Sequence, residues 1–172
     1  MQALTDFVAA ADLSSLEAFC AAYPAPALTL RFPDPGAAQP DLSQTADEES
    51  MAALLGDPMQ RTHLAFLVKS ERNPFGSIIS LGRSPQNDIC LPQRSVSKVH
   101  ATFSQVGRVW RVGDRTATHG LFVDRVEIPP GETAELDDGT LLSFGTDVEA
   151  TFHLPAGLYD YVRWFKRRAA GG

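Results

Sequence analysis

Residues 76–114, GSIISLGRSPQNDICLPQRSVSKVHATFSQVGRVWRVGD, alternate short β-branched or aromatic runs with turn-forming glycine, proline, asparagine and serine. Similar runs extend this pattern over residues 62–153. The runs are THLAFLVK, GSIISLG, NDICL, HATFSQ, RVWRVGD, LFVDRVEI, TAEL, TLLSFG and VEATFHL. Many short strands at close spacing are typical of a sandwich or barrel. The sequence therefore predicts a mainly β fold of many short strands, either a sandwich or a barrel.

Helical extensions are predicted on both sides of this β-rich region. Residues 3–22 follow helical spacing, Asp12 or Ser14 could cap a second helix, and the prolines at 24 and 26 end the run. Residues 27–32 fit a strand or a packed extension, 33–43 a linker and 47–55 a short helix. Residues 154–172 predict an amphipathic basic helix, which either packs on the sandwich or docks on a membrane or a partner. Three segments follow: 1–61, 62–153 and 154–172.

Composition narrows the classes of function. The net charge of the 172-residue chain is −6, which argues against binding nucleic acid through its phosphates. The charge is uneven: residues 1–61 carry a net −7 and residues 154–172 a net +3. No apolar run reaches the ~20 residues of a membrane span. A secretory signal would begin with basic residues, but none precedes Arg31. Two distant cysteines, Cys20 and Cys90, form no disulfide framework, so we expect a reducing, cytoplasmic location.

Four polar motifs interrupt the strand pattern. They are Gly82-Arg83, the stretch 97–100 (SKVH), the stretch 114–120 (DRTATHG) and the stretch 137–140 (DDGT). An arginine offers forked donors that match a phosphate, hydroxyls on loops donate without bulk, and a lysine adds a point charge. Loops on a rigid sandwich are a common place for recognition. Each motif is weak alone, but together they could bind a phosphate.

In this order the motifs resemble the forkhead-associated (FHA) family. The matching stretches are ISLGR at 79–83, NDI at 87–89, VSKVH at 96–100, the strand from Trp110 to Asp114, ATHG at 117–120 and the ending from Leu136 to Gly145. The resemblance implies an FHA-like β-sandwich of about 10–11 short strands that reads phosphothreonine on a protein partner. A stand-alone chain of this size resembles bacterial adaptors beside Ser/Thr kinases, so the expected partner is such a kinase or its substrate. The family consists of binding modules, which implies no catalysis and no cofactor.

The resemblance also assigns roles to individual residues. The implied phosphate-binding residues are Arg83, Ser97, Lys98 and Thr118. The implied structural supports of the loops are Gly82, His100 and Gly120.

Two further residues bear on the reading of a peptide. His119 stands where the family usually has an asparagine that holds the peptide backbone, and an imidazole cannot both donate and accept at one end as a carboxamide does. It is either a plain substitution or a pH-sensitive contact, since the reference pKa of histidine is about 6.5. Arg94 either reads an acidic residue three after the phosphothreonine or is a solvated loop arginine.

Thr45 lies in the acidic stretch DLSQTADEE at 41–49. Phosphorylated, it could occupy the phosphate site of its own chain or of a neighbour. Alternatively, Thr45 caps a short helix whose first turn carries the acidic residues.

Other classes of function fit less well. Ser97, His100 and Asp114 are the residue types of a nucleophilic triad, but Ser97 and His100 are three apart and no nucleophile elbow is present. The histidines and cysteines show no metal-ligand spacing. The remaining alternative is a phosphate-independent interaction or scaffold domain that uses the sandwich surface and the terminal helices.

Overall fold

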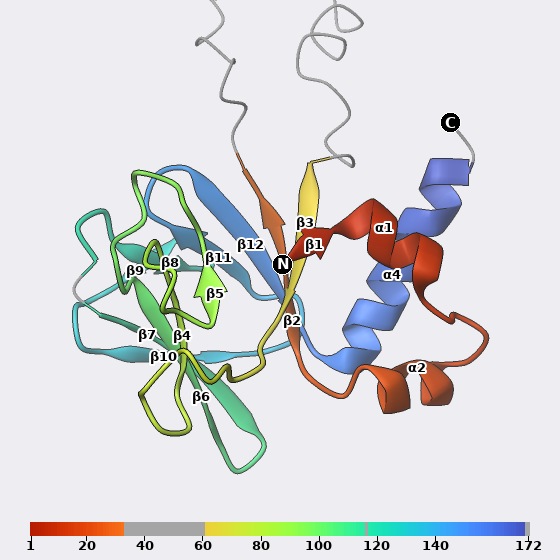
Figure 1. The fold of residues 1–172 in the computed structure, drawn as a ribbon, viewed down its shortest axis with the longest axis horizontal. Coiled ribbons are helices and arrows are strands. Elements are labelled where there is room, and N and C mark those ends of the chain that lie inside the picture. Colours follow the sequence, from red (N-terminus) through yellow and green to blue (C-terminus); the bar gives the residue numbers. More distant parts are fainter. Residues whose placement is uncertain (33–60, 116, 171–172) are drawn as a thin grey trace, which may run out of the picture.

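The computed structural model describes residues 1–32, 61–115 and 117–170. Two β-sheets face each other, and helices pack beside one end of the sandwich (Figure 1). Within the described residues, one sheet has seven strands in the order β1 (Gln2–Ala3), β3 (Thr62–Phe66), β2 (Ala27–Arg31), β12 (Val148–His153), β11 (Leu141–Phe144), β8 (Leu121–Val123) and β9 (Val126–Ile128). The other has five, in the order β10 (Thr133–Leu136), β7 (Val109–Asp114), β6 (Ala101–Val106), β4 (Ile79–Gly82) and β5 (Ile89–Cys90). The mainly β sandwich is confirmed.

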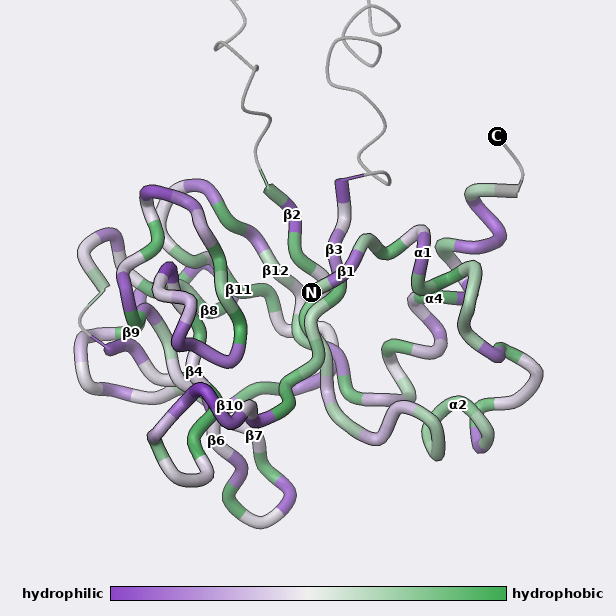
Figure 2. Tube along the Cα trace, in the orientation of Figure 1, coloured by the Kyte–Doolittle hydropathy of each residue, from purple (hydrophilic) through white to green (hydrophobic). Residues whose placement is uncertain are grey.

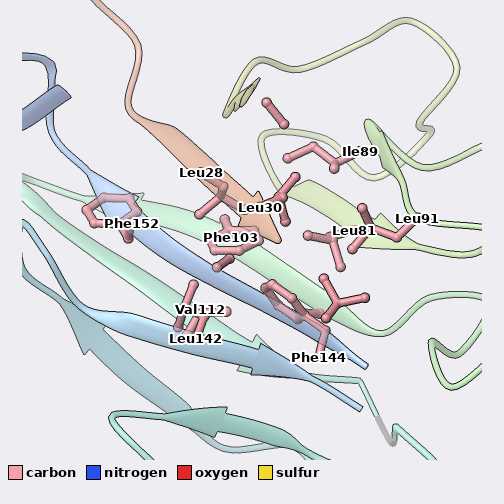
Figure 3. Packing of buried hydrophobic residues seen from close by; sticks show 14 of the residues in the cluster. Leu28, Leu30, Leu81, Ile89, Leu91, Phe103, Val112, Leu142, Phe144 and Phe152 are labelled. Atoms are coloured by element: carbon pink, nitrogen blue, oxygen red, sulfur yellow. The ribbon is translucent and has the colours of Figure 1, made fainter. Parts of the chain in front are cut away.

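Alternate residues of facing strands fill the space between the sheets. Leu28 and Leu30 of β2 point inward with Phe103 of β6, Phe144 of β11 and Phe152 of β12, and all five side chains are completely buried (Figure 3). Burying one such side chain stabilises a fold by about 1.5–3 kcal/mol. This core holds the strand ends, and therefore the loops that leave them, in fixed positions.

The stretch 27–32 contains β2, an interior strand of the seven-stranded sheet. β2 pairs with β12 on one side and with β3 on the other, so the sheet uses a strand that precedes the expected boundary at residue 62. Arg31 and Thr62 are direct partners in the register of β2 and β3. The predicted linker at 33–43, the predicted helix at 47–55 and Thr45 lie outside the described residues.

One expected strand, LFVDRVEI at 121–128, is two strands. β8 and β9 form a hairpin whose turn residues Asp124 and Arg125 have φ of 48° and 69°. Two left-handed residues make a turn that matches the twist of paired strands. Neither glycine nor asparagine marks this turn in the sequence, so the strand pattern alone does not predict the break.

The predicted N-terminal helix is split, as expected, into α1 (Leu4–Ala10) and α2 (Leu16–Ala22). The expectation that Asp12 or Ser14 caps α2 was wrong: Ser15 is the cap, and its side chain accepts a hydrogen bond from the amide of Ala18. Asp12 instead accepts from the amide of Ser14 in the link between the helices.

The C-terminal helix α4 (Pro155–Ala170) packs with α1 and α2 on the outer face of the seven-stranded sheet. Hydrophobic and hydrophilic stretches alternate along it (Figure 2). Its buried residues Leu158, Tyr159, Val162 and Phe165 join a second core with α1, α2 and residues of β2 and β3. Packing on the sandwich, one of the two alternatives, therefore accounts for its apolar face.

The loop before β11 fixes the start of α4. Asp138 accepts a hydrogen bond of 2.7 Å from the amide of Leu154, just before the helix. A Cβ at Gly157 would lie only 2.0 Å from the carboxylate of Asp138, so the glycine lets the carboxylate approach the helix N-terminus. A negative charge at that end is favoured by the helix dipole.

Candidate functional site

Three connections bring the predicted phosphate-binding residues to one end of the sandwich, on the side away from the helices (Figure 1). Arg83 follows β4, Ser97 and Lys98 lie between β5 and β6, and Thr118 lies between β7 and β8. The amide of Arg83 donates to the carbonyl of Ser97 over 2.8 Å, and its Nε donates to the carbonyl of Val96 over 3.2 Å. The first two loops are therefore joined, and the Arg83 side chain stays exposed.

Ser97 and Thr118 make a direct contact between the second and third loops. The amide of Thr118 donates to Ser97 Oγ over 3.1 Å, and Ser97 Oγ lies 3.4 Å from Thr118 Oγ1. Thr118 is exposed and Ser97 half-buried. Two hydroxyls and a guanidinium are thus presented from one loop cluster, and none of these three groups is an anion.

His100 holds the two loops from below. The amide of Ser97 donates to its Nδ1 over 3.1 Å, and its Nε2 lies 2.9 Å from the carbonyl of Gly120. Because an amide can only donate, Nδ1 carries no proton, and Nε2 donates to the carbonyl. Burial lowers the pKa of His100 below its ordinary value, against the hydrogen bond to Gly120 and the charge of Asp114, so the ring stays neutral.

Two glycines are required by this packing. A Cβ at Gly82 would lie 2.5 Å from the carbonyl oxygen of Lys98 and 2.9 Å from the amide nitrogen of His100. Gly120 has a φ of 74°, which favours glycine. Both positions fit the predicted role of structural support, and whether this support matters for ligand binding stays a prediction.

Asn87 is a support that the sequence reasoning did not single out, although it stands in the NDI stretch. Its buried carboxamide donates to the carbonyls of Lys98, over 2.6 Å, and Ser84, over 2.9 Å. A carboxamide two residues before a short strand is the signal that could have found it. It fixes the backbone of Lys98, whose side chain is exposed.

Asp88, the next residue, is a second support that was missed. Its fully buried carboxylate accepts hydrogen bonds from the amides of Ser70 and Ser80, at 2.6 and 2.7 Å, and from Asn73 Nδ2. Lys69 Nζ lies 3.9 Å away. Burial alone would raise the pKa of Asp88, but these hydrogen bonds outweigh it and lower the pKa to about 2. The carboxylate joins the β3–β4 loop to β4 and β5 and so anchors the start of the loop cluster.

The predicted peptide-reading residues are exposed. Arg94 lies in the β5–β6 loop, and His119 lies next to Thr118. Electrostatic interaction with His119 contributes to the lowered pKa values of His100 and of Asp147. Both residues can meet a partner, and their roles stay predictions.

The triad residue types are used for other contacts. Ser97 Oγ contacts Thr118, His100 is held by backbone groups at both nitrogens, and Asp114 accepts from the amide of Ala117 over 2.9 Å. His100 therefore does not hydrogen-bond the Ser97 hydroxyl. In the part of the chain that the structure describes, no three His, Cys, Asp or Glu side chains cluster as metal ligands. Among the described helices, none is long and apolar enough to span a membrane.

Comparison with known proteins bears on this cluster. The family model of the FHA domain matches residues 79–145, which run from β4 to the turn after β11. This part of the chain is an FHA domain. The match includes each predicted phosphate-binding residue and the supports Gly82, His100 and Gly120.

Solved FHA domains are also similar to the chain. One, studied for phosphothreonine-dependent FHA interactions, is 20% identical with a TM-score of 0.45 and covers 74% of this chain and 96% of its own. An FHA domain of an Arabidopsis thaliana protein is 18% identical with a TM-score of 0.48, over 76% and 86%. An FHA domain from Chlamydia trachomatis is 17% identical with a TM-score of 0.47, over 74% and 96%. The comparison with curated proteins found no match.

Proposed function

We propose that the chain is a phosphopeptide-binding adaptor that recognises phosphothreonine on a protein partner. The phosphate contacts are made by Arg83, Ser97, Lys98 and Thr118. The observation that carries the proposal is the contact between Ser97 and Thr118, beside an Arg83 whose backbone is bonded to the same loop. The FHA domain model covers these residues, and one similar FHA domain has been studied for phosphothreonine-dependent interactions, which supports this function.

The chemistry of the cluster suits a phosphate dianion. A guanidinium, an ammonium and two hydroxyls can all donate to phosphate oxygens, and charge-assisted hydrogen bonds are about twice as strong as neutral ones. The backbone of Ser97 and Lys98 is held by the contacts to His100 and Asn87, so little order has to be gained on binding. The function is therefore binding and not catalysis.

Peptide sequence is read around this phosphate site. Arg94 contacts an acidic residue after the phosphothreonine, and His119 takes the place of the backbone-binding asparagine. Because imidazole offers one polar atom per ring edge, His119 makes fewer backbone contacts than the carboxamide would. We expect the phosphate to supply a larger share of the affinity than the flanking residues.

A titration tests the proposal. Phosphothreonine peptides and their unphosphorylated twins are titrated against the wild type, Arg83→Ala and the control Arg72→Ala, which removes an exposed arginine from the β3–β4 loop. Losing hydrogen bonds to a charged group costs ~1.5–3 kcal/mol, so Arg83→Ala should weaken phosphopeptide binding by roughly tenfold or more. Arg72→Ala should leave it unchanged. Affinity that ignores both the phosphate and Arg83 would support the phosphate-independent interaction domain instead.

We further propose that the adaptor acts in Ser/Thr-kinase signalling in the cytoplasm, and that its partner is a kinase or a substrate of that kinase. Thr45 is the candidate internal ligand, because its acidic stretch is tethered at Arg31 and Thr62 on the same sheet. A chain phosphorylated at Thr45 should then bind external phosphopeptides more weakly. Equal affinity of phosphorylated wild type and Thr45→Ala for such a peptide would rule out this regulation.

A further inference from the structure

A polar hollow of about 260 Å³ lies on the seven-stranded sheet, on the face away from the sandwich core. Its lining comes from β2, β12, β11 and the turn between β8 and β9. The polar lining residues are Thr29, Arg31, Arg125, Ser143, Glu149 and Thr151. None of the predicted phosphate-binding residues lines this hollow.

The lining combines two cations, three hydroxyls and one carboxylate. Arg31 and Glu149 are direct partners across β2 and β12, and Arg125 reaches the hollow from the β8–β9 turn. A polyanion such as nucleic acid would meet Glu149 and a chain of net charge −6. A peptide with acidic side chains suits the lining better, because its carboxylates can pair with the arginines while its amides donate to Glu149 and the hydroxyls.

One wall of this hollow is rigid. Tyr161 of α4 lies within hydrogen-bonding reach of Arg31 and Thr29, and its ring centroid is 4.9 Å from that of His153 on β12. His153 Nε2 in turn lies 3.1 Å from Thr29 Oγ1. Trp164 follows along the helix, with its ring centroid 5.7 Å from that of Tyr161, and is 46% exposed. The packed helix thus lies beside the Arg31 side of the hollow through Tyr161, although no residue of α4 lines the hollow itself.

The other side of the hollow keeps an arginine in an unfavourable backbone position. Arg125 has a φ of 69° at the second turn position, where glycine is preferred. Asp124, the first turn residue, bonds to the neighbouring strand, since its carboxylate accepts from the amide of Leu141 in β11 over 3.0 Å. The fold of the hairpin therefore gives no reason for an arginine at 125, whereas a guanidinium beside the hollow does.

We propose that this hollow binds an extended acidic segment of a partner protein, with one carboxylate on Arg31 and another on Arg125. β2 and β8 are three strand spacings apart, or about 14 Å. An extended chain covers that distance in about four residues. The preferred segment carries acidic residues about four apart with small polar residues between them. This surface gives the adaptor a second contact, independent of the phosphate site.

The test uses the full chain and a fluorescein-labelled seven-residue peptide with glutamates at its second and sixth positions and serines elsewhere. Its twin carries glutamines at those two positions. The glutamate peptide should bind, more weakly as salt rises, and the glutamine peptide at least fivefold more weakly. Arg125→Gly and Arg31→Ala should each weaken binding at least fivefold. Because glycine is favoured at φ 69°, Arg125→Gly should keep or raise the thermal midpoint, so its loss of binding cannot be misfolding.

Matched controls separate this site from the others. Arg72→Ala and Arg83→Ala should bind the glutamate peptide like the wild type, and retained binding in Arg83→Ala separates this surface from the proposed phosphate site. No binding, or equal binding of both peptides or of Arg125→Gly, would overturn the proposal. Binding that appears only after residues 33–60 are deleted would also overturn it, in favour of the chain's own acidic segment as the occupant.

Discussion

Replacing Asp88 by asparagine should destabilise the fold by an amount that depends on pH. The pKa of this buried carboxyl is about 2, against an ordinary value of 3.8. One pKa unit corresponds to about 1.4 kcal/mol, so ionisation contributes about 2.4 kcal/mol at neutral pH. Because the folded-state pKa is depressed, this stabilisation is complete well above pH 3.8 and is lost as pH falls through 2. About half of it should remain at pH 3.

Urea unfolding of the wild type and Asp88→Asn at several pH values between 7 and 3 measures this difference. At pH 7 the variant should be less stable by about 2–4 kcal/mol, since an asparagine also turns one acceptor into a donor that faces the amides of Ser70 or Ser80. The gap should narrow by about 1 kcal/mol at pH 3. A gap below roughly 0.5 kcal/mol at pH 7, which is the level of an ordinary surface change, or a gap that does not narrow, would refute the reasoning.

Two other predictions concern the helix and the loops. Gly157→Ala should push the carboxylate of Asp138 away from the start of α4 and lower the thermal midpoint of unfolding. Amide hydrogen exchange should then rise in α4 more than in the sandwich. Unchanged exchange in α4 would contradict this prediction. Burial depresses the folded-state pKa of His100 and of His153, so below about pH 6.5 the unfolded chain binds protons first and stability falls as pH falls. Urea unfolding at pH 7.5 and 5.5 should show this loss, and His153→Asn should retain the part due to His100; a variant with no remaining loss would assign it all to His153.

Local patterns were enough for most of the strands and for the loop residues. Alternating apolar residues predict β6 and β7, and the order of Gly82-Arg83, Ser97 and Thr118 predicts one cluster. These features depend on residues that are close together in the sequence, so the sequence alone is enough to predict them. The structure brings Arg83, Ser97 and Thr118 together as the motif order predicted.

The features that were missed depend on contacts between distant parts of the chain. Asp88 looks like a turn residue, and only the fold brings Ser70, 18 residues earlier, to its carboxylate. The stretch 27–32 is ambiguous alone because its place between β3 and β12 is set by both neighbours. Arg125 was missed for the opposite reason, since arginine is a poor predictor of a left-handed turn.

The pairing of Arg31 with Thr62 has a consequence for how this chain can vary. Two residues that are neighbours across a sheet are separated by 30 others in the sequence, so the sheet fixes where this interval begins and ends regardless of its length. Lengthening a connection between two fixed positions costs only about 0.6 kcal/mol for each doubling of its length. New sequence can therefore be added between these two positions at little cost to the sandwich, as long as Phe32, which packs against the core, is kept. The fold therefore provides an insertion point where regulatory sequence can change while the β-sandwich stays the same.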